Sequence, residues 1–588
     1  MPTFSCLRPL PAALVLASLA IATAGHAAPP IRTATDPASQ RHSPLAQITP
    51  ANVGRLELAW RFPTGAMRGG HEGAPLVAGD TLYLVTPWPT RVIALDLATH
   101  RPRWIVTPEQ DASAPSRMCC DVVNRGPALA GGKLIVATAD TSLIALDAAT
   151  GRELWRAQID DPAHGASSTG APRVFGRSVI AGVAGGEYGV RGHLDAYDLD
   201  TGALRWRGYS TGPDAEVLID PARSTTWADG ATRPVGADSS LQSWRGDAWK
   251  LGGGATWGAF SFDAARRLVI YGSGNPGSWN PHTRPGDNRW TNALWARDLD
   301  TGRVRWVFQM TPHDEWDYDG INEALLFDGP RKRPLLAHFD RNGYVYVLDR
   351  ASGALLRADR FDPAANWATG IDARSGRPTV DPAKSPQAAA DDTTVADICP
   401  AAIGAKNQAP AAFNPALGLF FVPTTRLCMD METFTADYAA GQPWIGASYT
   451  LKPAPGADRR LGALVAWDAL AGKPAWTRDE ALPLWGGVLS TASGLVFYGT
   501  LDARVKAVDA RSGALLWTSP PLPSGVVGNV TSWSWRGRQF VGVLARAGGL
   551  AADPDGIGKL AGTRAAPAVE GELVVFALPE HSGQRVRR

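Results

Sequence analysis

Four acidic residues fall within six positions of the segment Thr311-Pro312-His313-Asp314-Glu315-Trp316-Asp317-Tyr318-Asp319-Gly320. In an extended chain Asp317 and Asp319 point to the same side. Carboxylates held side by side repel each other unless a cation lies between them. Together with Glu187 and Asn275, from two glycine-rich segments, they indicate an oxygen-only site for a hard metal ion. The alternative is that each acid is an ordinary solvated loop residue.

A second unusual segment is RMCCDVVNRG (117–126), which contains two adjacent cysteines. Neighbouring Cα atoms are about 3.8 Å apart, closer than the usual about 4.4–6.8 Å of a disulfide. A Cys119–Cys120 bond would therefore close a small, rigid ring. Apart from Cys6, which lies in a predicted signal peptide, the chain has four cysteines: this pair, Cys399 and Cys428. Four cysteines allow three pairings, and sequence distance favours Cys119–Cys120 and Cys399–Cys428. Two buried thiols are the alternative.

A repeat of the form Ala-x-Asp-x-x-Thr-Gly-x-x-x-Trp indicates the elements that must position these residues. Each copy follows an alternating, strand-like run, and its Asp and Gly are typical of a tight turn before the next strand. Most steps between copies are about 41–51 residues and two are about twice as long, so eight or nine units fit. The shared acid is Asp96, Asp147, Asp198, Asp298, Asp349, Asp468 and Asp509.

Strand-built units of this length predict an all-β fold, a β-propeller whose radial closure leaves few exposed strand edges. The repeated acids are expected to be structural. Six repeats end in a tryptophan, which we expect to pack between blades and to donate its N–H to a carbonyl. These residues are Trp104, Trp155, Trp206, Trp306, Trp476 and Trp517.

The N-terminus predicts export. Arg8 precedes an uncharged stretch that ends in small residues near Ala27, the layout of a secretory signal peptide over residues 1–27. The remaining residues, 28–588, are expected to form one propeller domain. A membrane anchor is the alternative, but the stretch is shorter than the about 18–20 residues that span a bilayer. The chain has no Cys-x-x-Cys-His motif and hence no covalent haem of its own.

Composition excludes some partners. The chain of 588 residues has 58 Lys and Arg against 56 Asp and Glu, a net charge of +2. Nucleic acids and anionic membrane surfaces demand a basic excess or stripe, so neither partner is expected. Its 22 tryptophans exceed its 16 phenylalanines, a surplus that the repeat explains in part.

Several long phrases carry a resemblance to a known family. They include GGHEGAPLV (69–77), MCCDVVNRG (118–126), GGEYGVRG (185–192), MTPHDEWDYDGINE (310–323), FDRNGYVYVLDR (339–350) and ICPAAIGAKNQAPAAF (398–413). With these phrases the sequence resembles the large subunit of methanol and alcohol dehydrogenases that use pyrroloquinoline quinone (PQQ), and more closely their lanthanide-dependent branch. The resemblance implies an eight-bladed β-propeller with tryptophan docking repeats and the quinone in its central funnel.

The resemblance also implies a cofactor site. The quinone would lie between the Cys119–Cys120 ring and the indole of Trp257, and Trp279 would form a wall of the substrate pocket. The positions that match cofactor-binding residues of the family are Glu72, Arg125, Thr169, Gly185, Gly186, Arg341, Asn407 and Trp485.

The chemistry implied by the resemblance is oxidation of a primary alcohol to the aldehyde. Glu187, Asn275 and Asp317 match the metal ligands, Asp317 matches the catalytic base, and Asp319 matches the additional acid of the lanthanide branch. Arg341 would add positive charge beside the quinone oxygens. The expected ion is a lanthanide, with Ca²⁺ as the alternative. The expected electron acceptor is a soluble c-type cytochrome of the periplasm, and a homodimer is considered.

Some positions depart from the family pattern. Ala184, Ala255 and Ala259 stand where relatives commonly have larger or hydroxyl-bearing residues. We therefore expect a roomier pocket that accepts methanol or larger alcohols. Two rival readings are a calcium-dependent sister enzyme and a non-enzymatic propeller scaffold of the envelope. The scaffold predicts neither the cysteine pair nor the acidic cluster.

Overall fold

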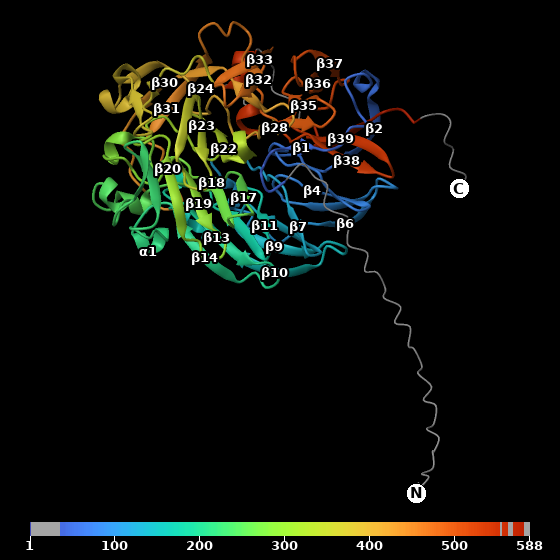
Figure 1. Cartoon of the computed structure of the whole chain (residues 1–588), viewed down its shortest axis with the longest axis horizontal. Coiled ribbons are helices and arrows are strands. Elements are labelled where there is room, and N and C mark those ends of the chain that lie inside the picture. The colour runs from blue at the N-terminus through green and yellow to red at the C-terminus, as the bar shows by residue number, and fades with distance from the viewer. Residues whose placement is uncertain (2–35, 553–555, 562–568, 581–588) are drawn as a thin grey trace.

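The computed structural model describes residues 1, 36–552, 556–561 and 569–580 (Figure 1). The segment predicted as a signal peptide lies outside the described residues. Most regular elements are strands, and the helical ones are short, so the expected all-β class is confirmed. The two α-helices of the described residues are single turns, α1 (Asp214–Val217) and α2 (Ile557–Ala561).

The described strands form eight sheets that each contain four antiparallel strands in a meander. The first four such sheets in the chain consist of β3 (Leu76–Ala78), β4 (Thr81–Val85), β5 (Val92–Asp96) and β6 (Pro102–Val106); β7 (Ala128–Ala130), β8 (Lys133–Ala137), β9 (Ser142–Asp147) and β10 (Glu153–Gln158); β11 (Arg173–Phe175), β12 (Ser178–Gly182), β13 (His193–Asp198) and β14 (Leu204–Tyr209); and β17 (Phe260–Asp263), β18 (Leu268–Gly272), β19 (Ala293–Asp298) and β20 (Val304–Gln309).

The other four follow in chain order, and the last is completed by a strand from the N-terminal part. They consist of β21 (Leu325–Asp328), β22 (Pro334–Phe339), β23 (Tyr344–Asp349) and β24 (Leu355–Arg360); β28 (Ala412–Asn414), β29 (Leu419–Thr425), β32 (Gly462–Asp468) and β33 (Lys473–Glu480); β34 (Leu489–Thr491), β35 (Leu495–Thr500), β36 (Arg504–Asp509) and β37 (Leu515–Thr518); and β38 (Thr531–Trp535), β39 (Arg538–Ala545) and β40 (Glu572–Ala577) with β2 (Glu57–Pro63).

Insertions account for the two long steps of the repeat. The step between Asp198 and Asp298 holds α1 and the hairpin β15 (Thr225–Ala228) with β16 (Ala231–Pro234). The step between Asp349 and Asp468 holds a hairpin and a three-stranded sheet: β25 (Ala368–Ile371) with β26 (Pro378–Val380), and β27 (Thr394–Ile398) with β30 (Leu427–Thr433) and β31 (Ala447–Pro453).

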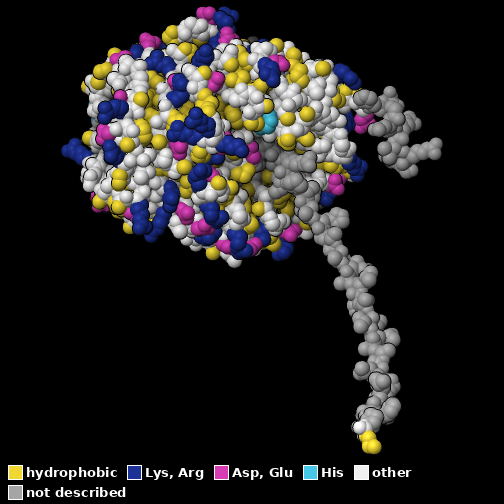
Figure 2. Space-filling model, in the orientation of Figure 1, with side chains coloured by type: hydrophobic (Ala, Val, Ile, Leu, Met, Phe, Trp, Pro, Cys, Tyr) yellow, Lys and Arg dark blue, Asp and Glu magenta, His cyan; other side chains and the backbone are white. Residues whose placement is uncertain are grey.

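Buried apolar clusters join each sheet to the next around a closed ring. One cluster joins β4 and β5 to β8 and β9 and contains both Val85 and Leu134. Another joins β34–β37 to β39 and β40. The ring closes where β2 pairs with β40, which follows it by more than 500 residues (Figure 1). Acidic and basic side chains are interspersed on the outer face in view (Figure 2).

The repeated phrase forms the predicted turn. In the second copy the Asp147 carboxylate accepts hydrogen bonds from the backbone N–H groups of Ala149 and Thr150, at 3.1 and 2.8 Å. Gly151 follows with φ of 76°, a left-handed conformation that costs glycine little. The Trp104 ring of the preceding copy packs against Gly151, and its indole N–H donates to the carbonyl of Ala148 at 3.2 Å. The same bond recurs from Trp155, Trp206, Trp306 and Trp476.

Replacing Trp306 by Phe should therefore destabilise the protein more than the same change at Trp517. Trp306 is 1% exposed and donates to the Arg350 carbonyl at 3.0 Å, and the lost partner of a buried carbonyl costs about 1–3 kcal/mol. The Trp517 indole N–H bonds no protein group in the described part of the chain, so Trp517→Phe is a matched control. Denaturant midpoints measure both variants, and equal losses would contradict the role given to the N–H.

A short N-terminal segment, Asp36–Ser43, crosses between sheets; we call it the strap. It contains β1 (His42–Ser43), which pairs in parallel with β34. Its bonds reach residues of six different sheets or their entry loops: Arg173, Phe262, Leu326, Phe413, Ser490 and Val530. The strap thereby links parts of the ring that are distant in sequence.

Candidate active site

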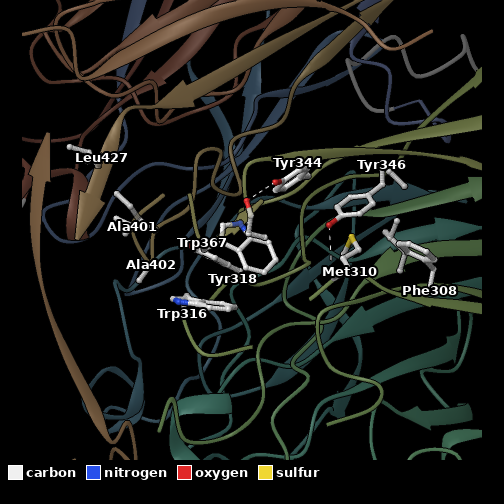
Figure 3. Close-up of a cluster of buried hydrophobic side chains, with 14 of the residues drawn as sticks. Phe308, Met310, Trp316, Tyr318, Tyr344, Tyr346, Trp367, Ala401, Ala402 and Leu427 are labelled. Atoms are coloured by element: carbon white, nitrogen blue, oxygen red, sulfur yellow. Dashed lines mark hydrogen bonds between the residues drawn. The ribbon is translucent and has the colours of Figure 1, made fainter. Parts of the chain in front are cut away.

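The acidic segment is positioned by the aromatic residues that alternate with its acids. Trp316 and Tyr318 are both fully buried in a cluster with Trp367 (Figure 3). The Tyr318 hydroxyl also donates to the Pro400 carbonyl at 2.7 Å. With these side chains anchored in the core, Asp317 and Asp319 reach the opposite side, where both line one cavity.

That cavity has a volume of about 130 Å³ and gathers most of the predicted site residues. Gly186 and Asn275 are not among its lining residues. Gly186 lies between the lining residues Gly185 and Glu187 in the chain, and Asn275 lies against Gly186. The predicted residues that line the cavity are Glu72, Cys119, Cys120, Arg125, Thr169, Gly185, Glu187, Trp257, Trp279, Asp317, Asp319, Arg341, Asn407 and Trp485.

Arg341 lies between the two acids. Its Nη1 is 3.2 Å from Asp317 Oδ2 and its Nη2 is 3.3 Å from Asp319 Oδ2. The other oxygen of Asp317, Oδ1, is buried and has no hydrogen-bond partner among the described residues. Asp317 also has φ of 66°, an uncommon conformation for a residue other than glycine and one that often marks functional sites.

Burial and mutual repulsion disfavour the charged acids. Burial raises the pKa of Asp317 well above its usual range, with Arg341 opposing this shift and Asp319 and Glu187 adding to it. Burial, followed by the charge of Asp319, raises the pKa of Glu187 to about 7. One arginine therefore faces three neighbouring carboxyl groups, an excess of negative charge that a multivalent cation would relieve.

The donor set fits a hard cation. Among the described residues no three His, Cys, Asp or Glu side chains stand gathered around an ion position, and Arg341 contacts two of the acids. The unpartnered Oδ1 of Asp317 is nevertheless available. Asn275 donates its backbone N–H to Asp319 Oδ1 at 2.7 Å, and its side-chain Oδ1 lies against Gly186, next to Glu187. Asn275 thus brings its amide oxygen close to the segment that carries Glu187.

Both disulfides favoured by the sequence are present, Cys119–Cys120 and Cys399–Cys428. The first is exposed and lines the cavity, which excludes the alternative of two buried thiols. The indole of Trp257 lines the same cavity, and the guanidinium groups of Arg125 and Arg341 lie 4.7 and 5.5 Å from its ring centre. The disulfide and the indole would offer rigid surfaces to a flat ring system, and two cations lie close to the indole.

A polar group lines another part of the cavity. Glu72 Oε2 is 2.8 Å from the Nη2 of Arg125, and Arg125 Nη1 donates to the hydroxyl of Thr169 at 2.8 Å. Burial raises the pKa of Glu72, and Arg125 and the Trp485 indole oppose this shift. Asn407 donates to the carbonyl of Ile403 at 3.1 Å. These contacts hold the side chains in place around the cavity.

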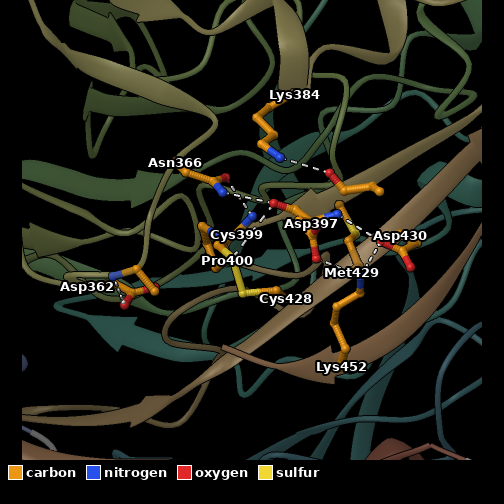
Figure 4. The surroundings of a disulfide bond; sticks show 12 residues. Asp362, Asn366, Lys384, Asp397, Cys399, Pro400, Cys428, Met429, Asp430 and Lys452 are labelled. Atoms are coloured by element: carbon orange, nitrogen blue, oxygen red, sulfur yellow. Dashed lines mark hydrogen bonds and ion pairs between the residues drawn. A yellow bond between two sulfur atoms is a disulfide. The ribbon is translucent and has the colours of Figure 1, made fainter. Parts of the chain in front are cut away.

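The second disulfide supports the loop that carries Asn407. Cys428 belongs to β30 and Cys399 follows β27, so the bond lies beside the inserted three-stranded sheet (Figure 4). Cys399 N–H donates to Asn366 Oδ1 at 2.8 Å. Asp397 meets Lys452 of β31 at 2.7 Å. The loop that continues from Cys399 to Asn407 is therefore anchored at its start.

Sequence reasoning missed several lining residues. They carry no repeat or acidic motif: Met118, Asp121, Val123, Ser167, Ile403, Gln408, Tyr449, Gly548 and Gly549. Tyr449 lies on β31 and stacks on Trp279 with ring centres 6.0 Å apart, so an insertion contributes to the pocket wall. Its place in an inserted strand, outside every repeat, gave no signal.

One expectation about pocket size is wrong in part. Ala184 lines the cavity, but Ala259 lines a different one together with Arg41 and Glu323. Gly258, which lies between Trp257 and Ala259, packs against the backbone of Ile321. The chain turns away from the active-site cavity at this glycine. The small side chain of Ala259 therefore adds no room beside the acids.

Comparison with known proteins identifies the family. The model of the PQQ family, described as the β-propeller domain of glucose, ethanol and alcohol dehydrogenases, matches residues 32–450 and 458–541. The chain belongs to this family. It is 47% identical over 568 residues to the lanthanide-dependent methanol dehydrogenase of Methylorubrum extorquens, which covers 93% of each chain.

Two further comparisons indicate the same family. Subunit 1 of the methanol dehydrogenase [cytochrome c] of Paracoccus denitrificans is 41% identical, over 88% of this chain and 83% of that protein. The solved structure of a europium-containing methanol dehydrogenase superposes with a TM-score of 0.86 at 44% identity, over 92% of this chain and 97% of that one. The described part of the chain contains no helix with the length and apolarity needed to cross a bilayer.

Proposed function

We propose that the protein is a lanthanide-dependent PQQ alcohol dehydrogenase that oxidises a primary alcohol to the aldehyde. The observation that carries this proposal is the meeting of the cysteine ring, the Trp257 indole and the Asp317–Arg341–Asp319 cluster in one cavity. A non-enzymatic scaffold would need none of these groups. The names of the lanthanide-dependent and europium-containing relatives support the choice of metal.

The chain's own residues would hold and orient the reactants. The disulfide and Trp257 offer two flat faces, which hold a flat group with little loss of entropy on binding. Glu72, Arg125, Thr169 and Asn407 would surround it with hydrogen-bonding groups, as would the backbone of Gly185 and the Trp485 indole. Bound PQQ would supply a two-electron acceptor, and a hard cation at Glu187, Asn275, Asp317 and Asp319 would supply Lewis acidity.

Asp317 is the proposed base. Its buried Oδ1 is free to accept the hydroxyl proton of the alcohol, and its Oδ2 is held by Arg341 at 3.2 Å. Arg341 thereby orients the carboxylate and brings positive charge to the cavity. Trp279, stacked on Tyr449, would form the wall that contacts the carbon chain of the substrate. Methanol or a larger primary alcohol is the proposed substrate.

We also infer the surroundings in which the enzyme acts. The eight sheets would be the blades of a single propeller domain over residues 28–588 with tryptophan docking, after removal of a signal peptide at residues 1–27. Such an enzyme would be periplasmic. A soluble c-type cytochrome would accept its electrons, which the name of the Paracoccus relative supports. Calcium in place of the lanthanide is the second candidate, and a homodimer the proposed assembly.

Reconstitution of the purified protein tests the function. PQQ is added with either lanthanum or calcium, and dye-linked turnover is followed across alcohols from methanol to butanol. We expect lanthanum-supported oxidation that disappears in Asp317→Asn. Absence of turnover with every alcohol and both ions would refute the proposal, and a steady fall of kcat/KM from methanol to butanol would refute the preference for larger alcohols.

Asp121 should control how tightly PQQ is retained. Its carboxylate accepts the N–H groups of Gly70 and Val122, each at 2.7 Å, and Gly549 packs against it. It therefore ties three loops together beside the cysteine ring. Asp121→Ala is expected to raise the PQQ concentration for half-saturation by about 10–100-fold, the loss of charge-assisted hydrogen bonds. Spectroscopic PQQ titration measures it, and Asp111→Ala, an exposed acid of the same loop, is the control.

A further inference from the structure

A second cavity shares a wall with the active-site cavity. Its volume is about 120 Å³, and Arg125 and Gln408 line both cavities. The other charged residues that line it are Arg41 from the strap, Arg173 from β11 and Glu323. Three guanidinium groups and one carboxylate therefore face the same small space.

Two of these charges are already neutralised. Glu323 Oε2 is 3.0 Å from the ammonium of Lys406, and both side chains are almost fully buried. Arg125 is paired with Glu72 on the side of the active-site cavity. The charges without a partner are thus those of Arg41 and Arg173.

Neither of these guanidinium groups forms an ion pair within the described residues. Arg41 is 5% exposed and donates to the carbonyls of Val488 and Val530, each at 2.7 Å. Arg173 donates to the backbone carbonyl of Asp36 at 2.9 Å. The Asp36 carboxyl acts on both arginines only beyond the 4.0 Å ion-pair distance.

No other acid is available from the preceding sequence, because residues 1–35 contain neither Asp nor Glu. Burial disfavours the charged form of both groups. Burial lowers the pKa of Arg41 to about 10, with Glu323 and Asp36 opposing this and Arg173 adding to it. Burial also lowers the pKa of Arg173. Buried charges are rarely left without a counter-charge.

We propose that this cavity binds one small inorganic oxyanion, of the size and charge of sulfate or phosphate, between Arg41 and Arg173. The planar guanidinium fork matches the paired oxygens of such an anion. Because Arg41 belongs to the strap and Arg173 to β11, the bound anion would fasten the strap to that sheet. Neither Arg41 nor Arg173 lines the active-site cavity.

Sulfate binding to the purified full-length protein tests this proposal. Sulfate replaces chloride at constant ionic strength, and isothermal titration calorimetry and the thermal midpoint are recorded. We expect one saturable site per chain and a rise of Tm that follows its occupancy, since a ligand that binds the folded state stabilises it. A parallel titration with phosphate should behave alike.

Matched variants separate this site from the general stabilising effect of sulfate. Arg173→Gln should weaken binding at least about tenfold, the loss of a charge-assisted bond. Arg177→Gln, on the exposed end of the same hairpin, should bind as the wild type does. Arg173→Lys should be intermediate, and it serves as the test if the glutamine variant does not fold. Identical titrations of wild type and Arg173 variants, or no saturable site in the wild type, would overturn the proposal.

Discussion

Lanthanum-supported turnover should fall by about 10²–10³-fold when Asp319 is replaced by Ala. Asp319 is 3% exposed and contacts Arg341, so its negative charge is placed beside the proposed ion in a buried position. Removal of one preorganised electrostatic partner in such a site has an effect of this size. A bound trivalent ion loses more electrostatic stabilisation than a divalent one when a carboxylate is removed. Turnover with calcium should therefore be reduced less than turnover with lanthanum.

Asp319→Asn distinguishes charge from geometry. The Asp319 carboxylate accepts the backbone N–H of Asn275 at 2.7 Å, and an asparagine keeps that bond while losing the charge. If Asp319→Asn retains lanthanum turnover while Asp319→Ala does not, the charge argument is wrong. Glu315→Gln is the control, because Glu315 lies on the same segment but bonds Ser385 and Gln387 away from the cavity.

Lys406→Met should be the most destabilising of the substitutions considered. The Lys406 ammonium lies 3.0 Å from Glu323 Oε2, and the two side chains are 0% and 2% exposed. Removing one member of a buried pair leaves an uncompensated charge and costs about 3–5 kcal/mol. The denaturant midpoint of the purified protein measures this loss.

The double variant Lys406→Met with Glu323→Gln should recover part of the stability, because no buried charge is left without its partner. A loss equal to the sum of the two single variants would contradict the pairing argument. The surface pair Lys250–Asp247, with side chains 56% and 75% exposed, provides the control. Lys250→Met should change stability by less than about 1 kcal/mol.

The sequence predicted the parts of the fold that repeat. The Asp and Gly of each phrase specify a turn through bonds and backbone angles within a few residues. Such a turn does not depend on distant parts of the chain, so the turns at Asp147 and Gly151 form as expected. The eighth sheet carries no such phrase. Its strands come from both ends of the described chain, β2 with β38–β40, and a pairing across such a distance leaves no local pattern to read.

The candidate site was predictable where residue types are rare. Adjacent cysteines and alternating acids and aromatics, such as Trp316 and Asp317, stand out from the background of ordinary loops. Tyr449 and Gln408 do not, because tyrosine and glutamine are common on strands and loops. Their place in the cavity depends on inserted segments that fold over the ring. The wrong expectation for Ala259 has the same origin, since one turn at Gly258 decides which cavity a side chain enters.

The strap sets an order of assembly. Its residues are synthesised before all eight sheets, yet one of its partners, Val530, follows Arg41 by 489 residues. The strap therefore cannot dock completely until nearly the whole chain has been made, since its contact with Val530 does not exist before the chain reaches β38. A segment that is made early thus makes its last contact only when the eighth sheet is assembled.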